Sequence, residues 1–169
     1  MGFNMDLILW RHAEAEDIAV SEANLQDADW DALDMRRQLT GKGKAQAQAM
    51  AQWLLTRIPA DTEILCSPAR RTEQTAAALE RPYQIEPGLR PGSHAGDILS
   101  TLNWSHSRPR QTLLLVGHQP WLGQIVAHLL GMSATQCAFK KAAVWWLRSR
   151  LRGDQEQTIL LTSMTPEML

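Results

Sequence analysis

Arg11 and His12 follow directly after a run of apolar residues, Leu7–Trp10, near the start of the chain. A guanidinium offers a planar pair of donors to phosphate oxygens, and an imidazole can attack phosphorus as a nucleophile. Short apolar runs that end in polar residues are typical of buried strands, and open α/β sheets bind ligands beyond the carboxyl ends of their strands. The pair therefore predicts the mouth of a phosphate site, although two strand-end residues that merely face water are the simpler interpretation of this pair alone.

Two later segments, Glu63–Cys66 and Thr112–Val116, are also predicted strands that end in polar residues. The side chains that follow them, all able to bind an oxyanion, are Ser67, Arg70, Arg71 and His118. If the three strands lie side by side in a parallel sheet, their carboxyl ends meet in one crevice. One imidazole there could take a phosphoryl group covalently, and the other, when protonated, could bind the oxygens of that group.

Three stretches, taken in order, resemble the signatures of the histidine phosphatase superfamily, which has the phosphoglycerate-mutase-like fold. These stretches are Arg11–Ala13, Ser67–Thr75 and Gly117–His118. The small size of the chain, the alanine after the first histidine and the string Leu39-Thr40-x-x-Gly43 are most similar to the SixA-type phosphohistidine phosphatases. The resemblance covers roughly residues 5 to 162.

The resemblance implies roles for four residues. His12 would be the nucleophile that becomes phosphohistidine, and His118 would be the second histidine of the pocket. Arg11 and Arg71 would bind the phosphoryl oxygens. Arg71, not its neighbour Arg70, matches the arginine of the middle signature, so Arg70 is expected at the surface or the rim.

Four further residues are candidates for the rim of the site or for proton donation: Arg37, Ser67, His94 and Asp97. Arg37 matches an arginine that often precedes the Leu-Thr step in such proteins, but Gln38 stands where that branch usually has proline. We expect Ser67 to cap the following helix rather than to touch substrate, and Asp97 to cap a short helix. His94 is the best alternative donor, and an exposed loop histidine is its simpler interpretation.

The chemistry of the leaving group favours phosphohistidine over a phosphate ester. An alkoxide needs a proton as it leaves, whereas an imidazole whose other nitrogen is protonated can leave neutral. In many relatives the carboxylic acid that donates this proton lies between the middle signature and the last histidine. That stretch here offers Glu80, Glu86 and Asp97, and Gly88 stands where we look for an acid. We therefore expect cleavage of a phosphoramidate.

Strands and helices are predicted to alternate around these residues. The expected strands are Met5–Trp10, Glu63–Cys66, Tyr83–Glu86 and Thr112–Val116, with a late hairpin of Ala142–Leu147 and Thr158–Leu161 around Gly153 and Asp154. The expected helices are Lys42–Ile58, Pro68–Glu80, Asp97–Leu102 and Pro120–Leu130. This order predicts a three-layer α/β/α sandwich, with a mostly parallel sheet and an antiparallel edge hairpin, in one domain over residues 1–169.

The acidic segment of residues 14–34 is expected to be mostly a solvated loop with one helical turn. A lid or a loop that sets specificity is the alternative interpretation.

Composition limits the classes of partner and compartment. The 169 residues carry a formal net charge of −1, which argues against a nucleic-acid binder that relies on basic charge. The sequence has no signal-peptide pattern and no apolar run near the roughly 20 residues that span a bilayer, so we expect no membrane association and a cytoplasmic protein. Cys66 and Cys137 are expected to be free thiols. Cys66 and Arg71 are one residue too close for a Cys-x5-Arg thiol phosphatase. No histidine pair has zinc-ligand spacing, so we expect no metal and no cofactor.

The leading hypothesis is a phosphatase that acts on a phosphohistidine-containing phosphotransfer protein. A small phosphorylated substrate, such as a sugar or nucleotide phosphate, is the second hypothesis. A non-catalytic phosphate-binding module is the third, and the presence of every expected site residue argues against it. The sequence leaves the oligomeric state open.

Overall fold

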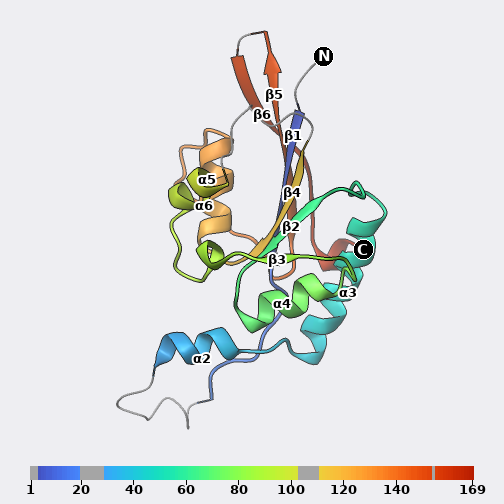
Figure 1. Cartoon of the computed structure of the whole chain (residues 1–169), viewed down its shortest axis with the longest axis vertical. Helices are drawn as coiled ribbons and strands as arrows, with labels where there is room; N and C mark the ends of the chain where they lie inside the picture. Colours follow the sequence, from blue (N-terminus) through green and yellow to red (C-terminus); the bar gives the residue numbers. More distant parts are fainter. Residues whose placement is uncertain (1–3, 20–28, 103–110, 154) are drawn as a thin grey trace.

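The computed structural model describes residues 4–19, 29–102, 111–153 and 155–169 (Figure 1). The strands are β1 (Asn4–Arg11), β2 (Glu63–Cys66), β3 (Gln84–Ile85), β4 (Thr112–Gly117), β5 (Val144–Arg152) and β6 (Gln155–Met164). The helices are α2 (Trp30–Arg36), α3 (Gly41–Leu55), α4 (Arg70–Ala77), α5 (Ala95–Thr101) and α6 (Trp121–Leu129), with short 3-10 turns at Pro87–Leu89 and Pro166–Met168.

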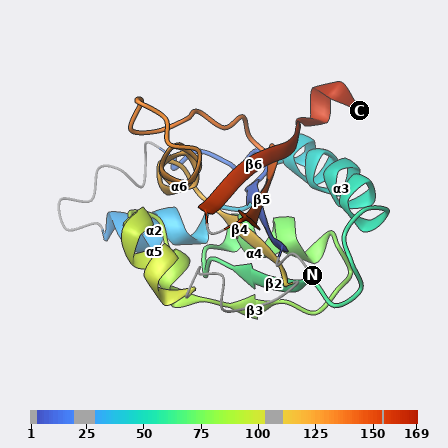
Figure 2. The same cartoon turned by 90° about the horizontal axis from the view of Figure 1, so that it is seen from above.

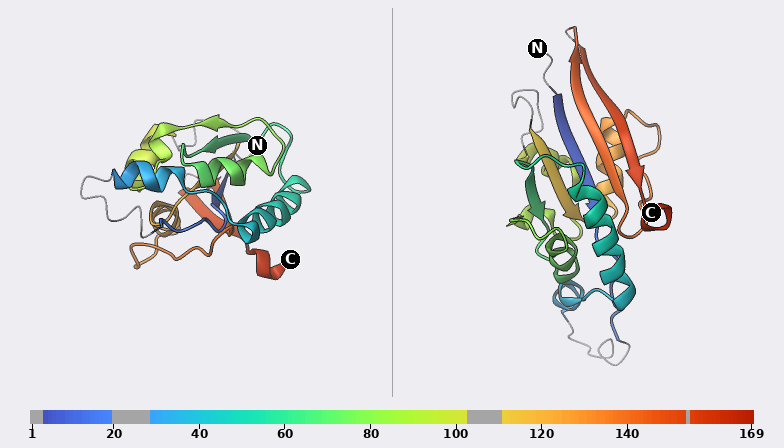
Figure 3. Two further views of the ribbon diagram at one scale, coloured as in Figure 1. Left: turned by 90° about the horizontal axis from the view of Figure 1, so that it is seen from below. Right: turned by 90° about the vertical axis from the view of Figure 1, so that its right-hand side faces the viewer.

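The described strands form one sheet in the order β3-β2-β4-β1-β5-β6. The first four strands in this order are parallel to one another. Strand β5 runs antiparallel to β1, and β6 pairs antiparallel with β5 at the edge of the sheet. Helices α3 and α4 cover one face of the sheet, and α5 and α6 cover the other (Figures 2 and 3). The fold is therefore the predicted α/β sandwich with an antiparallel edge hairpin.

Strand β1 lies in the middle of the sheet and carries side chains into both halves of the core. Ile8 and Trp10 pack into the cluster formed with α3 and α4, and Leu7 and Leu9 pack into the cluster formed with α5 and α6. All four side chains are fully buried. Because helices cover both faces, the strand is a continuous apolar run instead of an alternating one. This packing fixes the position at which the strand ends, and therefore the positions of Arg11 and His12.

Two glycines permit close approaches next to the strand ends. A Cβ atom at Gly117 would lie 2.0 Å from the ring of Trp121, and one at Gly43 would lie 1.9 Å from the backbone oxygen of Glu14. Both distances are far below van der Waals contact. The first glycine lets α6 pack against the end of β4, directly before His118. The second lets the start of α3 pack against the segment that follows His12.

Several element bounds differ from the predicted ones. Helix α4 begins at Arg70 instead of Pro68 and ends at Ala77, and the strands of the edge hairpin are longer than predicted. The hairpin prediction followed the apolar residues, but the β5–β6 ladder pairs polar residues as far as Arg152 and Gln155. Asp154, expected in the turn of the hairpin, lies outside the described residues.

The acidic segment contains a helix, α2, where mostly solvated loop was expected. The Asp29 side chain accepts a hydrogen bond from the Ala32 N–H and caps this helix, and no residue of α2 is buried. The helix lies beyond the carboxyl ends of the parallel strands (Figure 1). Residues 20–28 of the acidic segment lie outside the described residues. Within the described residues, no helix has the length and apolar character needed to cross a membrane.

Candidate active site

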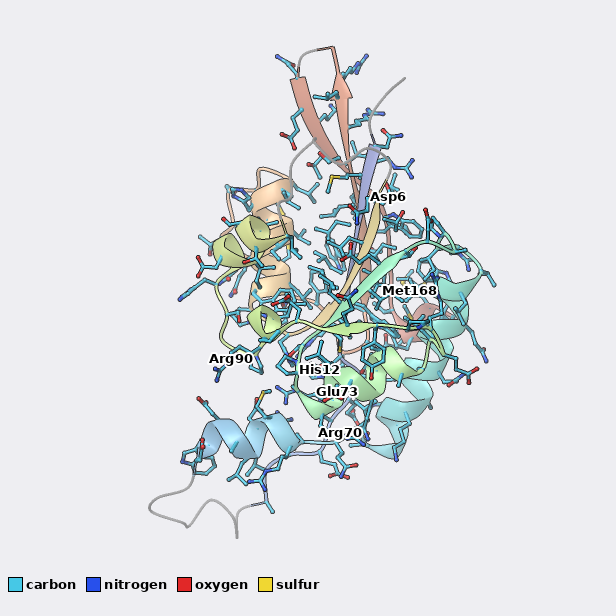
Figure 4. All side chains as sticks on the ribbon, viewed as in Figure 1. Asp6, His12, Arg70, Glu73, Arg90 and Met168 are labelled. Atoms are coloured by element: carbon cyan, nitrogen blue, oxygen red, sulfur yellow. The ribbon has the colours of Figure 1, made fainter. Side chains whose placement is uncertain are left out.

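The ends of three parallel strands meet as the sequence predicts. Strand β1 pairs with β4 so that Arg11 lies opposite Gly117, and β2 pairs with the other side of β4. The ring centroids of His12 and His118 are 5.2 Å apart, and the charges of Arg11 and Arg71 act on both rings. Figure 4 places His12 at the end of β1 that faces α2. We call Arg11, His12, Arg71 and His118 the strand-end cluster.

The backbone and the ring of His12 are both held by hydrogen bonds. Its N–H donates to the Gly117 carbonyl oxygen and its own carbonyl oxygen accepts from Ala142, each at 3.0 Å. The ring atom Nδ1 lies 2.7 Å from the Ala13 carbonyl oxygen. A carbonyl oxygen only accepts, so Nδ1 carries the proton and Nε2 of the neutral ring carries a free lone pair.

Burial lowers the pKa of His12 to about 3, and the positive charges of Arg71 and Arg11 act in the same direction against the hydrogen bond to Ala13. His12 is therefore uncharged at neutral pH. An uncharged imidazole with a free lone pair at a fixed nitrogen has the form required of a nucleophile.

His118 is also uncharged within the strand-end cluster. Burial, and after it His12 and the neighbouring arginines, together lower its pKa to about 2. The expectation of a protonated second imidazole therefore requires the negative charge of a phosphoryl group beside the ring. Its Nε2 lies 2.7 Å from Ser67 Oγ, and its Nδ1 has no hydrogen-bond partner. Nδ1 is thus the ring atom that is left for an oxygen of a ligand.

Ser67 does not cap helix α4, which corrects the prediction. The residue at the capping position is Ala69, and the cap has no side-chain hydrogen bond. The helix begins two residues later than expected, so the fully buried Ser67 hydroxyl points to His118 instead. Its oxygen also lies 3.4 Å from the Ala69 nitrogen, whose N–H donates to it. Ser67 therefore orients a ring of the cluster.

Arg71 is 4% exposed and is held by a residue that sequence reasoning missed. Its Nη1 donates to the backbone oxygen of Asp34, and its Nη2 donates to Asp34 Oδ2 at 2.8 Å. The other carboxylate oxygen accepts from Arg37 Nη1 at 3.0 Å. Asp34 belongs to the acidic segment that was expected to be mostly a solvated loop. The available signal was its spacing, three residues before Arg37, which suits an ion pair at the end of a helix.

The strand-end cluster holds buried donors without partners. Among the described residues, four buried side-chain nitrogens lack a hydrogen-bond partner, and three of them are Arg11 Nε, Arg71 Nε and His118 Nδ1. Arg11 also donates through Nη1 to the backbone oxygen of Phe139. A buried donor without a partner costs about 1–3 kcal/mol, and an oxyanion offers several acceptors at once. The cluster therefore has the polarity and the free donors of an oxyanion site.

The end of the middle signature holds the surrounding loops in place. Gln74 Oε1 accepts from the Leu39 N–H at 2.7 Å, and Thr75 Oγ1 accepts from the Ala13 N–H at 3.1 Å. Thr75 also donates to the backbone oxygen of Arg71 at 2.8 Å. These bonds join helix α4 to the segment that follows His12 and to the segment before α3.

Arg37 lies at the rim of the cluster, where its charge acts on both histidine rings. Besides Asp34, it contacts the backbone oxygen of Glu16 at 2.6 Å and the carboxylate of Asp17 at 3.6 Å. Arg70 is exposed, as expected of a surface or rim residue.

The structure does not join His94 or Asp97 to the cluster. Both side chains are exposed, and within the described residues no hydrogen bond or ion pair connects either one to the cluster. Asp97 is not the cap of α5, which corrects the prediction, because the helix begins at Ala95 and its capping position falls on His94. The His94 side chain makes no capping hydrogen bond.

The other acids considered as proton donors are also engaged or exposed. Glu86 Oε1 accepts from the Gly88 N–H at 2.9 Å, and Glu80 is exposed. Burial raises the pKa of the Cys66 thiol to about 12, so this residue is not a thiolate nucleophile. Within the described residues, no group of three or more histidine, cysteine, aspartate or glutamate side chains is placed to hold a metal ion.

The chain matches a family model and several proteins over most of its length. Residues 7–98 match the model of the histidine phosphatase superfamily (branch 1). The chain is 31% identical to a phosphohistidine phosphatase SixA homolog of Haemophilus influenzae over 140 residues, which cover 75% of this chain and 78% of the relative. It is 35% identical to an uncharacterised protein of Picosynechococcus sp. over 169 residues, which cover 94% of this chain and 96% of the relative.

Solved structures support the same fold. The structure of the protein histidine phosphatase SixA complexed with tungstate has a TM-score of 0.73 at 23% identity, and the match covers 97% of this chain and 99% of that chain. A SixA-like protein of Agrobacterium tumefaciens has a TM-score of 0.73 at 21% identity over 95% of this chain and 97% of its own. The family model, the Haemophilus relative and the shared fold agree: this chain belongs to the histidine phosphatase superfamily, in its SixA-type branch, and is a phosphatase.

Proposed function

We propose that this phosphatase removes the phosphoryl group from a phosphohistidine-containing phosphotransfer protein, through a covalent phosphohistidine on His12. The observation that carries the proposal is the state of the His12 ring. Its Nδ1 proton is held by the Ala13 carbonyl oxygen, so the lone pair of Nε2 is free beside three arginines and His118.

In the first step, His12 Nε2 forms a bond to phosphorus as the bond from phosphorus to the substrate imidazole breaks. The leaving ring takes the electron pair and departs neutral, provided that its other nitrogen carries a proton. Arg11 and Arg71 bind the phosphoryl oxygens and stabilise the charge that develops on them. Nδ1 of His118 has no hydrogen-bond partner in the protein, which leaves it available to one of the same oxygens.

In the second step, a water oxygen forms a bond to phosphorus and the bond from phosphorus to His12 Nε2 breaks. The electron pair of that bond returns to Nε2, which restores the neutral ring. Both protons of the water leave with the product, as dihydrogen phosphate. Nδ1 of His12 keeps its proton throughout and donates it to the Ala13 carbonyl oxygen, so Nε2 is ready for the next transfer.

The surroundings of the strand-end cluster support a phosphoramidate substrate. A departing alkoxide needs a carboxylic acid as donor, and among the described residues the carboxylate that contacts the cluster is Asp34. Burial raises the pKa of Asp34, but the hydrogen bonds from Arg71 and Arg37 outweigh burial and leave the pKa below its usual value. Asp34 is therefore ionised at neutral pH and has no proton to give. The relative from Haemophilus, a phosphohistidine phosphatase by name, favours the same substrate class.

A panel of substrates tests the proposal. Turnover is compared on a phosphohistidine-containing protein, on p-nitrophenyl phosphate, and on sugar and nucleotide monophosphates. We expect the highest kcat/KM on the phosphohistidine protein, and turnover of p-nitrophenyl phosphate because its leaving group needs no donor. A clear preference for an unactivated sugar or nucleotide ester would overturn the assignment of the substrate. Binding of phosphate without turnover of any substrate would favour a non-catalytic module.

A further inference from the structure

Asp34 joins Arg71, the arginine proposed to bind the phosphoryl group, to helix α2. Arg71 comes from α4, and Asp34 comes from α2, near the end of that helix. The two Nη atoms of Arg71 donate to the backbone oxygen and to the carboxylate of this one residue. Two hydrogen bonds to one residue fix the plane of a guanidinium as well as its position.

The same hydrogen bonds set the orientation of the Arg71 donors that remain for a ligand. Each Nη uses one of its two N–H groups on Asp34, and Nε is the nitrogen of this group that has no partner. Arg71 is 4% exposed, so its side chain has little room to turn. The orientation of the free donor therefore depends on the contact with Asp34.

Asp34 also sets the net charge of the site. The guanidinium groups whose charges act on both histidine rings are those of Arg71, Arg11 and Arg37. Both rings are uncharged, and the Asp34 carboxylate bridges Arg71 and Arg37. Asp17 also lies 3.6 Å from Arg37, but its side chain is fully exposed and water screens its charge. The three guanidinium groups and Asp34 together leave a net charge of two, which equals the charge of a phosphoryl dianion in magnitude.

We infer that Asp34 is a positioning residue, which orients Arg71 for phosphoryl transfer and limits the positive charge of the site so that phosphate can leave. This inference rests on the proposed role of Arg71 in binding the phosphoryl group. Removal of the carboxylate leaves three positive charges around the anion, so phosphate binds more tightly. It also removes the charged acceptor of Nη2, so the guanidinium of Arg71 is held less firmly in its plane and the chemical step slows. The two effects have opposite signs, which a loss of folding alone does not produce.

The test compares Asp34→Asn and Asp34→Ala with the wild type and with Asp31→Asn. Asp31 lies on the same helix, and its exposed carboxylate is 3.8 Å from Arg90. This control removes one acid from α2 without touching the strand-end cluster. The readouts are kcat and KM for p-nitrophenyl phosphate and the Kd of inorganic phosphate by calorimetry, with circular dichroism to confirm folding.

For Asp34→Asn we expect kcat to fall by about 10-fold, because a misplaced catalytic group costs up to about 100-fold. The Kd of phosphate should fall by about 3-fold, as for a partly exposed charge. Asp34→Ala should lower kcat at least as much, and Asp31→Asn should match the wild type in all three quantities. Weaker phosphate binding in a folded Asp34→Asn protein would mean a merely structural role and overturn the inference. A rise in kcat would overturn the inference as well, because the Asp34 carboxylate would then only compete with the substrate for Arg71.

Failure of the proposed function gives a different result. If the wild type turns over no phosphoryl substrate, or if His12→Ala keeps full turnover, the catalytic proposal fails. The calorimetric comparison of phosphate binding needs no turnover and still decides whether Asp34 limits the charge of the site. Unchanged phosphate affinity in Asp34→Asn would contradict that role whether or not the protein is catalytic.

Discussion

The charged residues at the two ends of strand β1 differ in whether the protein itself satisfies their polar atoms. Near its amino end, Asp6 accepts hydrogen bonds from Arg148 Nε at 2.6 Å, from Arg148 Nη2 at 2.8 Å and from Trp146 Nε1 at 3.0 Å. We call these three residues the Asp6 cluster. Pairing with Asp6 raises the pKa of the Arg148 guanidinium against the effect of burial. Both oxygens of the buried carboxylate have partners, so the charges of this cluster balance.

At the carboxyl end of the same strand, the strand-end cluster is not balanced. Burial lowers the pKa of Arg11 and of Arg71, and the charge of Arg71 lowers that of Arg11 further. Three buried nitrogens of the cluster have no partner.

The difference between the two clusters distinguishes buried polar groups that stabilise the fold from those that are available to bind a ligand. A structural group is satisfied by the protein itself, whereas a binding group keeps donors that the protein leaves free. Substitutions in the Asp6 cluster should therefore change stability and leave turnover unaffected. Substitutions in the strand-end cluster should change turnover first.

The largest expected effect is that of His12→Asn on turnover. Without the nucleophilic nitrogen, kcat for p-nitrophenyl phosphate should fall by about 10³-fold or more. The free energy of unfolding at neutral pH should fall by about 1–3 kcal/mol at most, because the substitution removes one buried ring and its hydrogen bond to Ala13. Steady-state kinetics and urea unfolding measure the two quantities. A loss of kcat of about 10-fold or less is what a positioning residue would give, so a loss of that size would exclude His12 as the nucleophile.

Arg71→Ala should have the next largest effect. Loss of one donor to the developing charge costs about 10²- to 10³-fold in kcat. The neighbouring variant Arg70→Ala is the matched control, because Arg70 is exposed on the same helix, and its kcat/KM should match that of the wild type. Calorimetry with vanadate provides a second readout. An unchanged vanadate affinity in Arg71→Ala would remove this residue from the oxyanion site.

Asp6→Asn should affect stability and leave turnover unchanged. The substitution leaves Arg148 and Trp146 without their charged partner, which we expect to cost about 2 kcal/mol of unfolding free energy. Because Arg148 is partly exposed, water compensates for part of the loss. The exposed acid Asp61 provides the control variant, Asp61→Asn, with no expected change. A fall in kcat of the folded Asp6→Asn protein would contradict the separation of the two ends.

The smallest expected effect is a pH dependence of stability that comes from the strand-end cluster. His12 and His118 have folded-state pKa values of about 3 and about 2, below the ordinary value of 6.5. Above pH 6.5 both states carry neutral rings and the pH has no effect through them. Below pH 6.5, the unfolded chain binds protons at these rings and the folded chain does not. The free energy of unfolding therefore decreases as the pH is lowered, by on the order of 1 kcal/mol per ring and pH unit.

His118→Gln should remove part of this decline. Urea unfolding at about pH 7 and about pH 5.5 compares the variant with the wild type, with pH values chosen on either side of the ordinary histidine pKa. The wild type should lose more stability than the variant over this interval. Equal losses would mean that the His118 ring accepts a proton in the folded protein.

Most strands of the sheet could be predicted from the sequence, because each one is marked by its own short run of apolar residues. Strand β2 has the predicted bounds, β1 is one residue longer than predicted at each end, and β4 is one residue longer at its carboxyl end. Apolar runs bounded by polar residues are enough to locate buried strands. The convergence of His12 and His118 then followed from the rule that parallel strands present their carboxyl ends at one edge.

The contacts that orient the cluster were not predictable in the same way. The partner of Arg71 is Asp34, 37 residues away in sequence, on a helix that has no buried residue and hence no apolar pattern. The contact of Ser67 with His118 depends on a helix start that lies two residues later than the proline at position 68 suggested. Side-chain pairs of this kind depend on the positions of whole elements, which composition and periodicity do not give.

The covalent intermediate on His12 is the most direct test of the account. The enzyme is mixed with p-nitrophenyl phosphate, quenched in alkali within the first turnover, and analysed by peptide mass spectrometry, since phosphohistidine survives alkali. The account predicts one phosphoryl group on His12 in the wild type and none in His12→Asn. A phosphoryl group on another residue, or steady turnover with no phosphorylated enzyme at any time, would contradict it.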